Sequence, residues 1–306
     1  MYDLIGDIHG HADELHRLLA KLGYKPDSAG VYRHAEARQV IFLGDFIDRG
    51  PAIRQTLQTV RAMVEGGSAL AVMGNHEYNA LAFWAFDPTG GHLRPHRPLH
   101  ILQHLRTIEE FSSQELFAEW QGYLQWFYTL PLFLELPGLR VVHACWDARY
   151  ISYLRGQLPD ARLTPDFLLA ASRVGSEEFR AVEVTLKGHE MPLPDNHHFF
   201  DKDGHRRHMV RTAWWLNPAQ ATCGQYFLES IEALAEQPVN LAALPNASYY
   251  QDETPVFFGH YWLRGQPQLL TPHSVCLDYS VAKGGELVAY RWQGEQVLRA
   301  EGLVWG

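Results

Sequence analysis

The sequence has few cysteines and no long apolar segment. Its 306 residues include three cysteines, Cys145, Cys223 and Cys276, which lie far apart and form no CxxC pair. Isolated cysteines in odd number make a poor disulfide framework and suit a reducing compartment, so we expect a cytoplasmic protein. No apolar run approaches the length of a membrane span, and the N-terminus lacks the basic and apolar regions of a secretory signal, so we expect no membrane partner.

Positive charge is also scarce. The chain has 26 Lys and Arg residues against 35 Asp and Glu, a net charge of −9 at pH 7 and a pI near 6.0. Because nucleic-acid phosphates require a basic surface, we expect no nucleic-acid partner. Hydrophobic residues make up 46% of the chain, enough for a large core. Nothing in the pattern indicates an oligomeric state.

Three polar clusters each follow a short apolar run that is typical of a buried strand. They are Gly6–Gly10 (GDIHG), Gly44–Gly50 (GDFIDRG) and Gly74–Glu77 (GNHE). A helical pattern follows each cluster; from Pro51 to Glu65 apolar residues recur on one face, with proline in the first turn. Since ligands of open α/β sheets bind at the carboxyl ends of the strands, we expect these polar groups to share one site.

With these motifs the sequence resembles the calcineurin-like metallophosphoesterases, and within them the phosphoprotein phosphatase branch of bacterial type. The resemblance covers the first half of the chain and its C-terminal part. It implies an α/β fold with a two-sheet β-sandwich flanked by helices, the four-layer αββα architecture. We expect residues 1–306 to form a single metallophosphoesterase domain, with an insertion or cap-like region at about 146–254.

Other segments give local predictions. Leu99–Tyr128 predicts two helices, and Leu132–His143 predicts a β-hairpin that ends on a histidine. Val275–Tyr279 and Leu287–Trp292 predict closing strands of the second sheet.

The segment from His92 to His100 is rich in histidine, arginine and proline. Its prolines interrupt any helix, so it predicts a surface loop that carries a substrate-facing cation, Arg94 or Arg97.

The resemblance implies two divalent metal ions. The expected ligands of one are Asp7, His9 and Asp45, and those of the other are Asp45, Asn75, His143 and His260, so that Asp45 bridges. At the position of His143 the family usually continues HGG, whereas this chain has His143-Ala144-Cys145, which leaves the ligand in place. Mixed nitrogen and oxygen ligands favour Mn, with Fe or Zn as alternatives, over Ca or Mg.

Two Gly-His pairs compete for the last ligand position. Gly188-His189 follows a helical pattern, so Gly188 is typical of a helix C-cap. Gly259-His260 follows the apolar run Val256–Phe258, so His260 emerges at a strand end like the other ligands. We therefore expect His260, with His189 as the alternative.

The remaining motif residues suit proton transfer and phosphate binding. In the resembling family the position of His76 protonates the leaving oxygen, and that of Asp48 orients its ring. Arg49 would hold the phosphoryl oxygens, with Asn75 beside it. Arg211 is a second candidate phosphate clamp that no motif supports; a surface arginine stacked on Trp214 or Trp215 is the alternative.

We therefore expect a dinuclear-metal phosphatase that hydrolyses phosphate monoesters, preferably on phosphorylated serine and threonine of proteins, by attack of a metal-bridging hydroxide. The alternative is a diadenosine tetraphosphate hydrolase, since bacterial relatives with the same motifs cleave phosphoanhydrides. A third reading is a catalytically inactive scaffold. The expected partner is a phosphorylated protein or a small phosphoester. The segment 146–254 carries no pattern that decides between these substrates.

Overall fold

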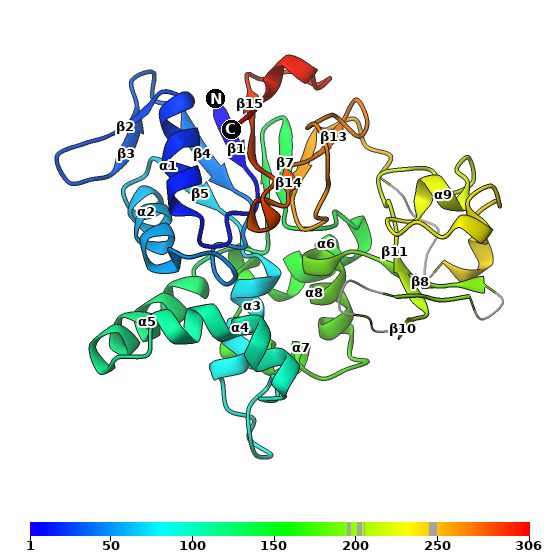
Figure 1. The fold of residues 1–306 in the computed structure, drawn as a ribbon, viewed down its shortest axis with the longest axis horizontal. Coiled ribbons are helices and arrows are strands. Elements are labelled where there is room, and N and C mark those ends of the chain that lie inside the picture. Colours follow the sequence, from blue (N-terminus) through cyan, green and yellow to red (C-terminus); the bar gives the residue numbers. More distant parts are fainter. Residues whose placement is uncertain (195–196, 201–203, 205, 245–249) are drawn as a thin grey trace.

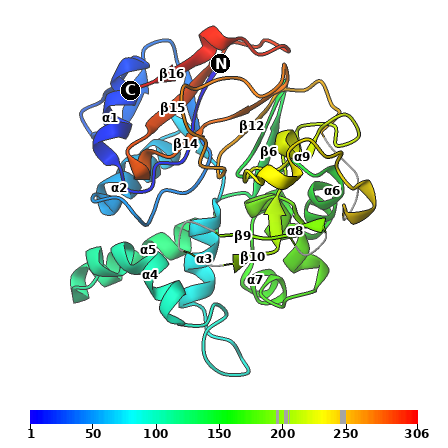
Figure 2. The ribbon, with the colours of Figure 1, turned by 45° about the vertical axis from the view of Figure 1, so that its right-hand side comes forward.

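The structure is a computed structural model that describes residues 1–194, 197–200, 204, 206–244 and 250–306. Two β-sheets pack face to face, and helices cover the outer face of each (Figure 1, Figure 2). This arrangement confirms the predicted α/β sandwich with helices on both sides. The main helices are α1 (Ala12–Lys21), α2 (Ile53–Glu65), α3 (Asn75–Trp84), α4 (Pro98–Glu110), α5 (Gln114–Phe127), α6 (Ala148–Gln157), α7 (Pro165–Ala171), α8 (Glu177–Lys187) and α9 (Cys223–Tyr226).

The first sheet carries the parallel strands that follow one another in the N-terminal half. Its order is β14-β15-β1-β4-β5, with β16 paired to β15. Strands β1, β4 and β5 are parallel, whereas β15 is antiparallel to β1. The bounds are β1 (Tyr2–Ile5), β4 (Gln39–Phe42), β5 (Ala69–Ala71), β14 (Asp278–Tyr279), β15 (Glu286–Trp292) and β16 (Leu303–Trp305).

The second sheet has the order β13-β12-β7-β6. The predicted hairpin is confirmed as β6 (Phe133–Leu136) and β7 (Leu139–Val142), and β12 (Val256–Phe258) lies parallel between β7 and β13 (Ser274–Cys276). Three small antiparallel pairs lie outside both sheets: β2 (Tyr24–Pro26) with β3 (Tyr32–His34), β8 (Glu190–Pro192) with β11 (Met209–Arg211), and β9 (Phe199–Phe200) with β10 (Arg206–Arg207).

Alternation along the strands builds the layers. Leu4 and Ile41 point into the core between the sheets, where they meet Phe257 of the second sheet. Their neighbours Ile5 and Phe42 point the other way, into the cluster under α1 and α2. Because successive side chains of a strand face opposite sides, each apolar run must be covered on both faces, which the four layers achieve.

One strand prediction was wrong. The segment Leu287–Trp292 does not close the second sheet; it forms β15, an inner strand of the first sheet, with Tyr290 opposite Leu4. Its residues are apolar toward both sides, with Val288 and Tyr290 between the sheets and Leu287 and Ala289 in the outer cluster. A strand apolar on both faces suits an inner position rather than a closing edge. The other predicted segment, Val275–Tyr279, is divided between two strands: β13 belongs to the second sheet and β14 to the first.

The helices between Leu99 and Tyr128 are confirmed as α4 and α5, which lie with α3 across the end of the sandwich where β4 and β5 finish (Figure 2). The predicted loop from His92 ends earlier than expected, because Pro98 starts α4 in the first-turn position that proline favours. Among the described residues, no helix combines the length and the apolar character that a membrane crossing requires.

Candidate active site

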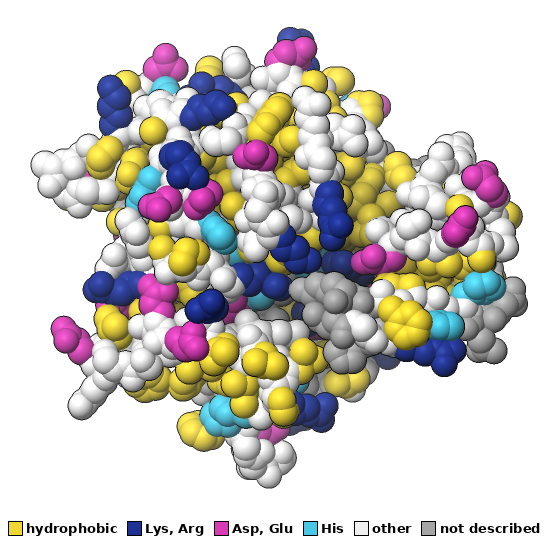
Figure 3. Space-filling view, viewed as in Figure 1, with side chains coloured by type: hydrophobic (Ala, Val, Ile, Leu, Met, Phe, Trp, Pro, Cys, Tyr) yellow, Lys and Arg dark blue, Asp and Glu magenta, His cyan; other side chains and the backbone are white. Residues whose placement is uncertain are grey.

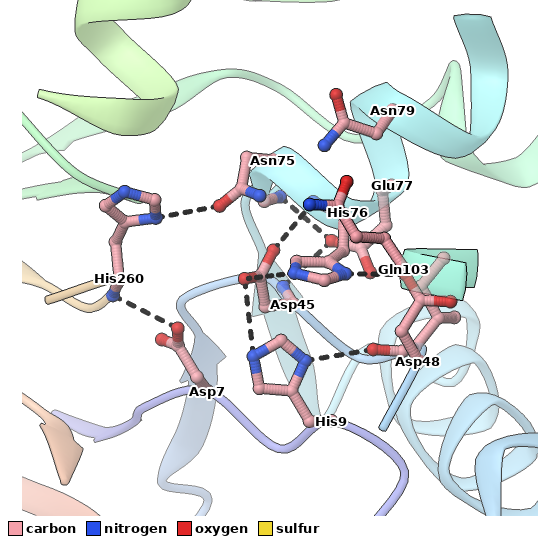
Figure 4. Close-up of polar contacts among 12 residues, drawn as sticks. Asp7, His9, Asp45, Asp48, Asn75, His76, Glu77, Asn79, Gln103 and His260 are labelled. Carbon is pink, nitrogen blue, oxygen red and sulfur yellow. Dashed lines mark hydrogen bonds and ion pairs between the residues drawn. The ribbon is translucent and has the colours of Figure 1, made fainter. Parts of the chain in front are cut away.

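The carboxyl ends of strands from both sheets deliver polar side chains to one place (Figure 4). Asp7 and His9 follow β1, Asp45 follows β4, and Asn75 follows β5. From the second sheet, His143 follows β7 and His260 follows β12. The structure thus brings together the residues that the motifs singled out.

Asp45 lies at the centre of this cluster. Its Oδ2 is 3.5 Å from His9 Nε2, 3.5 Å from His143 Nε2 and 3.9 Å from His76 Nε2. Two sets of donor atoms, each within 4.8 Å of one another, share this carboxylate: His9, Asp45 and His76 form one, and Asp45, His143 and His260 form the other. Two adjoining donor sets with one common carboxylate fit a pair of cations.

Asn75 and Asp7 complete the surroundings. The Oδ1 of Asn75 is 2.7 Å from His260 Nδ1 and 3.1 Å from His143 Nε2. Asp7 accepts a hydrogen bond from the His260 amide on Oδ2 at 3.0 Å, while its buried Oδ1 has no hydrogen-bond partner among the described residues. Asp7 stands outside both donor sets. Its orphaned oxygen is still a feature that a cation would satisfy.

Two histidines are held by backbone acceptors with Nε2 toward Asp45. His9 Nδ1 donates to the Ile47 carbonyl at 2.9 Å, and His143 Nδ1 donates to the Leu43 carbonyl at 2.7 Å. Each ring thereby presents Nε2 to the Asp45 carboxylate. Such a backbone acceptor behind the ring is the usual support of a metal-binding histidine.

The electrostatics of the cluster favour added positive charge. Burial raises the pKa of Asp7, and the neighbouring carboxylates of Asp278 and Asp45 raise it further. Burial and the nearby His76 lower the pKa of His9 to about 3, which keeps that ring neutral. For His143, burial lowers the pKa, but the carboxylates of Asp45 and Asp7 outweigh it and raise it to about 10. Cations between these groups would supply the positive charge that a proton on His143 or Asp7 would otherwise supply.

The motif loops are strained and cross-bonded. His9, Asp45, Asp48, Arg49 and His260 all have positive φ, between 47° and 74°. Non-glycine residues adopt this conformation at a cost, and such residues cluster at functional sites. Hydrogen bonds between the loops stabilise it: the amides of Ile8 and His9 both donate to the Asp45 carbonyl, at 3.1 and 2.8 Å.

Glu77 is a site residue whose role was not predicted from its motif. It is fully buried, and its carboxylate accepts hydrogen bonds from the amides of Asp45 and Phe46 at 2.8 Å each and of Gly74 at 3.0 Å. It therefore joins the second motif loop to the third. The signal was available: a glutamate three residues after the helix N-cap is the second half of a capping box.

Close backbone approach explains the glycine that opens the second motif. A Cβ on Gly44 would lie 2.5 Å from the Gly74 amide nitrogen, and Gly44 has φ +94°. Only glycine permits both the approach and the left-handed conformation. The ends of β4 and β5 can therefore come close enough to place Asp45 beside Asn75.

His76, a member of the first donor set, is anchored by Asp48. His76 Nδ1 is 2.5 Å from Asp48 Oδ2. The other oxygen of Asp48 accepts from His104 Nδ1 at 2.8 Å and from Thr107 Oγ1 at 2.6 Å. Burial raises the pKa of Asp48, but His104 and His76 outweigh it and hold that pKa far below its usual range. The surroundings of Asp48 therefore favour its ionised form behind the His76 ring.

His104 and Thr107, both on α4, were not found from the sequence. The indole Nε1 of Trp84 donates to His104 Nε2 at 3.2 Å, which leaves the proton on Nδ1 for Asp48. In the sequence, only a spacing of three along a predicted helix marks His104 and Thr107. Many surface pairs share that spacing.

The two predicted phosphate-binding arginines lie in different places. Arg49 borders a cavity of about 250 Å³ beside Asn75 and His76, and its guanidinium lies 4.3 Å from the centre of the Trp262 ring. Arg211, at the end of β11, lies 3.4 Å from Glu229 and borders a second cavity of about 590 Å³ that His260 also lines. The structure does not bring Arg211 into the cavity of Arg49.

The two competing histidines are also separated. His260 belongs to the donor set of Asp45 and His143. His189 instead contacts Asp147, with 2.8 Å between its Nε2 and Oδ2, beside a third cavity lined by Trp146 and Trp214.

Comparison with known proteins gives the following matches. Residues 2–210 match the family described as calcineurin-like phosphoesterase. A symmetrical bis(5'-nucleosyl)-tetraphosphatase of Janthinobacterium sp. (strain Marseille) is 26% identical over 290 residues, 93% of this chain and 90% of that protein. An asymmetrical bis(5'-nucleosyl)-tetraphosphatase of Geobacillus sp. (strain WCH70) is 49% identical over 74 residues, 24% of this chain. The chain spans only 30% of that relative's length.

Among solved structures, the chain is similar to one described as a putative diadenosine tetraphosphatase. The TM-score is 0.44 with 16% identity, covering 100% of this chain and 92% of the other.

Proposed function

The chain belongs to the calcineurin-like phosphoesterase family and is a metal-dependent hydrolase, and we propose that the cluster around Asp45 is its catalytic centre. The observation that carries the proposal is the pair of donor sets that share Asp45, one of which includes His76. A phosphoester substrate follows from the family. An inactive scaffold is disfavoured, since every donor of the motifs is present and directed at one space.

We assign the donors to two divalent cations as the family resemblance implies. Asp7, His9 and Asp45 would hold one, and Asp45, Asn75, His143 and His260 the other, with Mn preferred and Fe or Zn as alternatives for mixed nitrogen and oxygen donors. Asp7 lies outside the donor sets and is included for its unpartnered Oδ1, whereas His76 of the first set is kept for proton transfer. When bound, such a pair supplies Lewis-acid charge at the phosphoryl group and an activated water. We keep His260 rather than His189 as the last ligand because His189 contacts Asp147.

The chain's own residues then position the substrate and move a proton. His76 donates from Nε2 to the leaving oxygen, while Asp48 accepts its Nδ1 hydrogen and stabilises the charged ring. Arg49 holds phosphoryl oxygens with its guanidinium, which Trp262 supports by stacking. Arg211 is retained as a second phosphate contact from the side of His260.

Two substrate classes are supported by different observations. The motif set resembles the phosphoprotein phosphatase branch, which favours monoesters of serine and threonine in proteins. The relative that covers 93% of this chain is named for hydrolysis of a dinucleoside tetraphosphate, which favours phosphoanhydrides. In both cases the segment 146–254 acts as a cap: of its described residues, Lys187 and Arg211 border cavities that also contain His76 or His260.

The experiment is a substrate panel on metal-stripped protein with and without Mn(II). It compares p-nitrophenyl phosphate, phosphoserine, phosphothreonine and phosphotyrosine peptides, and diadenosine tetraphosphate. We expect activity to disappear with chelator and to return with Mn(II). The class hydrolysed with the higher kcat/KM, phosphate monoesters or the phosphoanhydride, would identify the substrate. Cys145→Ser is the matched control, because that buried cysteine has no role in the proposal. Full activity without metal, or loss only in Cys145→Ser, would refute it.

A further inference from the structure

The cavity beside His76 is lined by cations. Arg49, Arg94 and Lys187 border it, with Asn79 and Gln103 between them, and the carboxylate on its wall is that of Asp48. Asp48 is already engaged by His76, His104 and Thr107. This surplus of positive charge stands out in a chain of net charge −9. In Figure 3, Lys and Arg side chains also gather near the middle of the face shown.

Arg94 is the cation whose charge is least compensated. Its guanidinium donates to the amide oxygens of Asn79 at 2.9 Å and Gln103 at 2.7 Å, which carry no charge. No ion pair between Arg94 and a carboxylate is found within the described part of the chain; Glu183 and Asp48 act on it only at longer range. Burial lowers its pKa, as expected for a desolvated cation without a close anion. Two neutral amides thus fix the guanidinium in place and leave its charge available.

Lys187 brings another cation to the same cavity from a different helix. It is the last residue of α8, is paired with Glu183, and borders both the cavity of His76 and the one that His260 lines. Arg97, the other cation of the loop before α4, is exposed and does not line the cavity. The structure therefore singles out Arg94 of the two arginines considered from the sequence.

The position of His76 decides what the cavity receives. His76 belongs to the donor set of His9 and Asp45, and it also borders this cavity. A ring that protonates the leaving oxygen lies next to the bond that breaks, so the leaving group begins beside His76. The leaving group therefore extends into the cavity of Arg94 and Lys187.

We propose that this cavity is a phosphate subsite for the leaving group, so that the preferred substrates are phosphoanhydrides of the nucleoside polyphosphate class. The proposal rests on the proposed function of the Asp45 centre. A serine or threonine leaving group is neutral and would leave the Arg94 charge without an anion. A leaving phosphate carries charge that grows as the bond breaks, so cations placed there stabilise the transition state more than the bound substrate.

The bond changes are those of a hydrolysis. One water is consumed: its oxygen bonds to phosphorus and it releases one proton to solvent. The bond between phosphorus and the bridging oxygen breaks, and the electron pair stays on that oxygen. His76 supplies a proton to the leaving phosphate, whose remaining negative charge faces Arg94 and Lys187.

The test compares two substrates whose leaving groups differ in charge. The leaving group of diadenosine tetraphosphate carries phosphate, and that of p-nitrophenyl phosphate carries none. We expect Arg94→Gln to lower kcat/KM for diadenosine tetraphosphate by about 10- to 100-fold, the share of one charged hydrogen-bonding partner. On p-nitrophenyl phosphate the same variant should change kcat/KM by less than about threefold. Lys187→Gln should show the same selectivity, and Arg97→Gln, the matched control, should change neither substrate.

The outcomes separate this inference from the function on which it rests. Equal losses of Arg94→Gln on both substrates, or no loss on either, would overturn the subsite. A loss confined to phosphopeptides with acidic flanking residues would assign the cavity to peptide side chains and overturn it as well. A wild-type protein inactive on both small substrates with Mn(II) would refute the Asp45 centre instead. Arg94→Lys, which keeps the charge, should recover part of the diadenosine tetraphosphate activity, so that a folding defect in Arg94→Gln is recognised.

Discussion

Replacement of His104 tests whether the network behind His76 contributes to catalysis. His104 is buried beside Trp84, Phe111 and Trp120. His104→Leu therefore places an apolar side chain of similar size in an apolar neighbourhood. The change removes one of the three hydrogen bonds to the Asp48 carboxylate, the one from Nδ1 at 2.8 Å. A hydrogen bond to a charged group contributes ~1.5–3 kcal/mol. That range corresponds to a loss of roughly 10- to 150-fold if the bond is fully used in the transition state.

The loss should depend on the leaving group. With an alkyl phosphate, which needs protonation, we expect turnover of His104→Leu to fall by ~10- to 100-fold, below or at the lower end of the ~10²–10⁴-fold loss expected for His76→Asn. With p-nitrophenyl phosphate the loss should be much smaller, because nitrophenolate leaves without a proton. Unchanged kinetics on the alkyl phosphate, or equal losses on both substrates, would refute this role of the network.

Three further changes probe the scaffold. Glu77→Ala leaves three buried amides unsatisfied, so we expect a loss of ~3 kcal/mol or more of unfolding free energy in denaturant titrations, together with reduced bound metal. Gly259→Ala should displace Asp7, since a Cβ there would lie 1.9 Å from Asp7 Oδ1; metal analysis should show lowered occupancy with the fold intact by circular dichroism. Burial raises the pKa of Asp147, but the hydrogen bond and charge of His189, together with the amides of Tyr150 and Arg149, outweigh burial and lower that pKa. The carboxylate therefore stabilises the fold above about pH 4, the unfolded value, and this stability is lost as pH falls through the depressed native value. Asp147→Asn should therefore be less stable than wild type at pH 7, with a difference that shrinks in acid denaturation below pH 4.

The strand-end residues could be predicted because local patterns determine them. Asp7, Asp45 and Asn75 each follow a short apolar run and a glycine, and parallel strands bring their carboxyl ends to one edge. The placement of His260 followed from the same argument. These statements need only the period of a strand and the direction of the chain.

Other parts of the site depend on contacts between distant segments. His104 meets Asp48 across 56 positions of sequence, and no local pattern marks such a pair. The partner of β15 could not be read from its apolar residues, because they suit either sheet. The sequence left Arg94 and Arg97 as alternatives for the substrate-facing cation. Choosing Arg94 required the positions of α3 and α4.

The measurement that tests the account most directly is the amount of metal bound per chain after reconstitution with Mn(II) and removal of free metal. Because Asp45 belongs to both donor sets, wild type should bind two ions and Asp45→Ala should lose both, together with activity. His260→Ala should lose one, and His189→Ala, the matched control, should keep two. An Asp45→Ala protein that retains two ions, or a wild-type protein that is active with none, would contradict the shared-carboxylate centre.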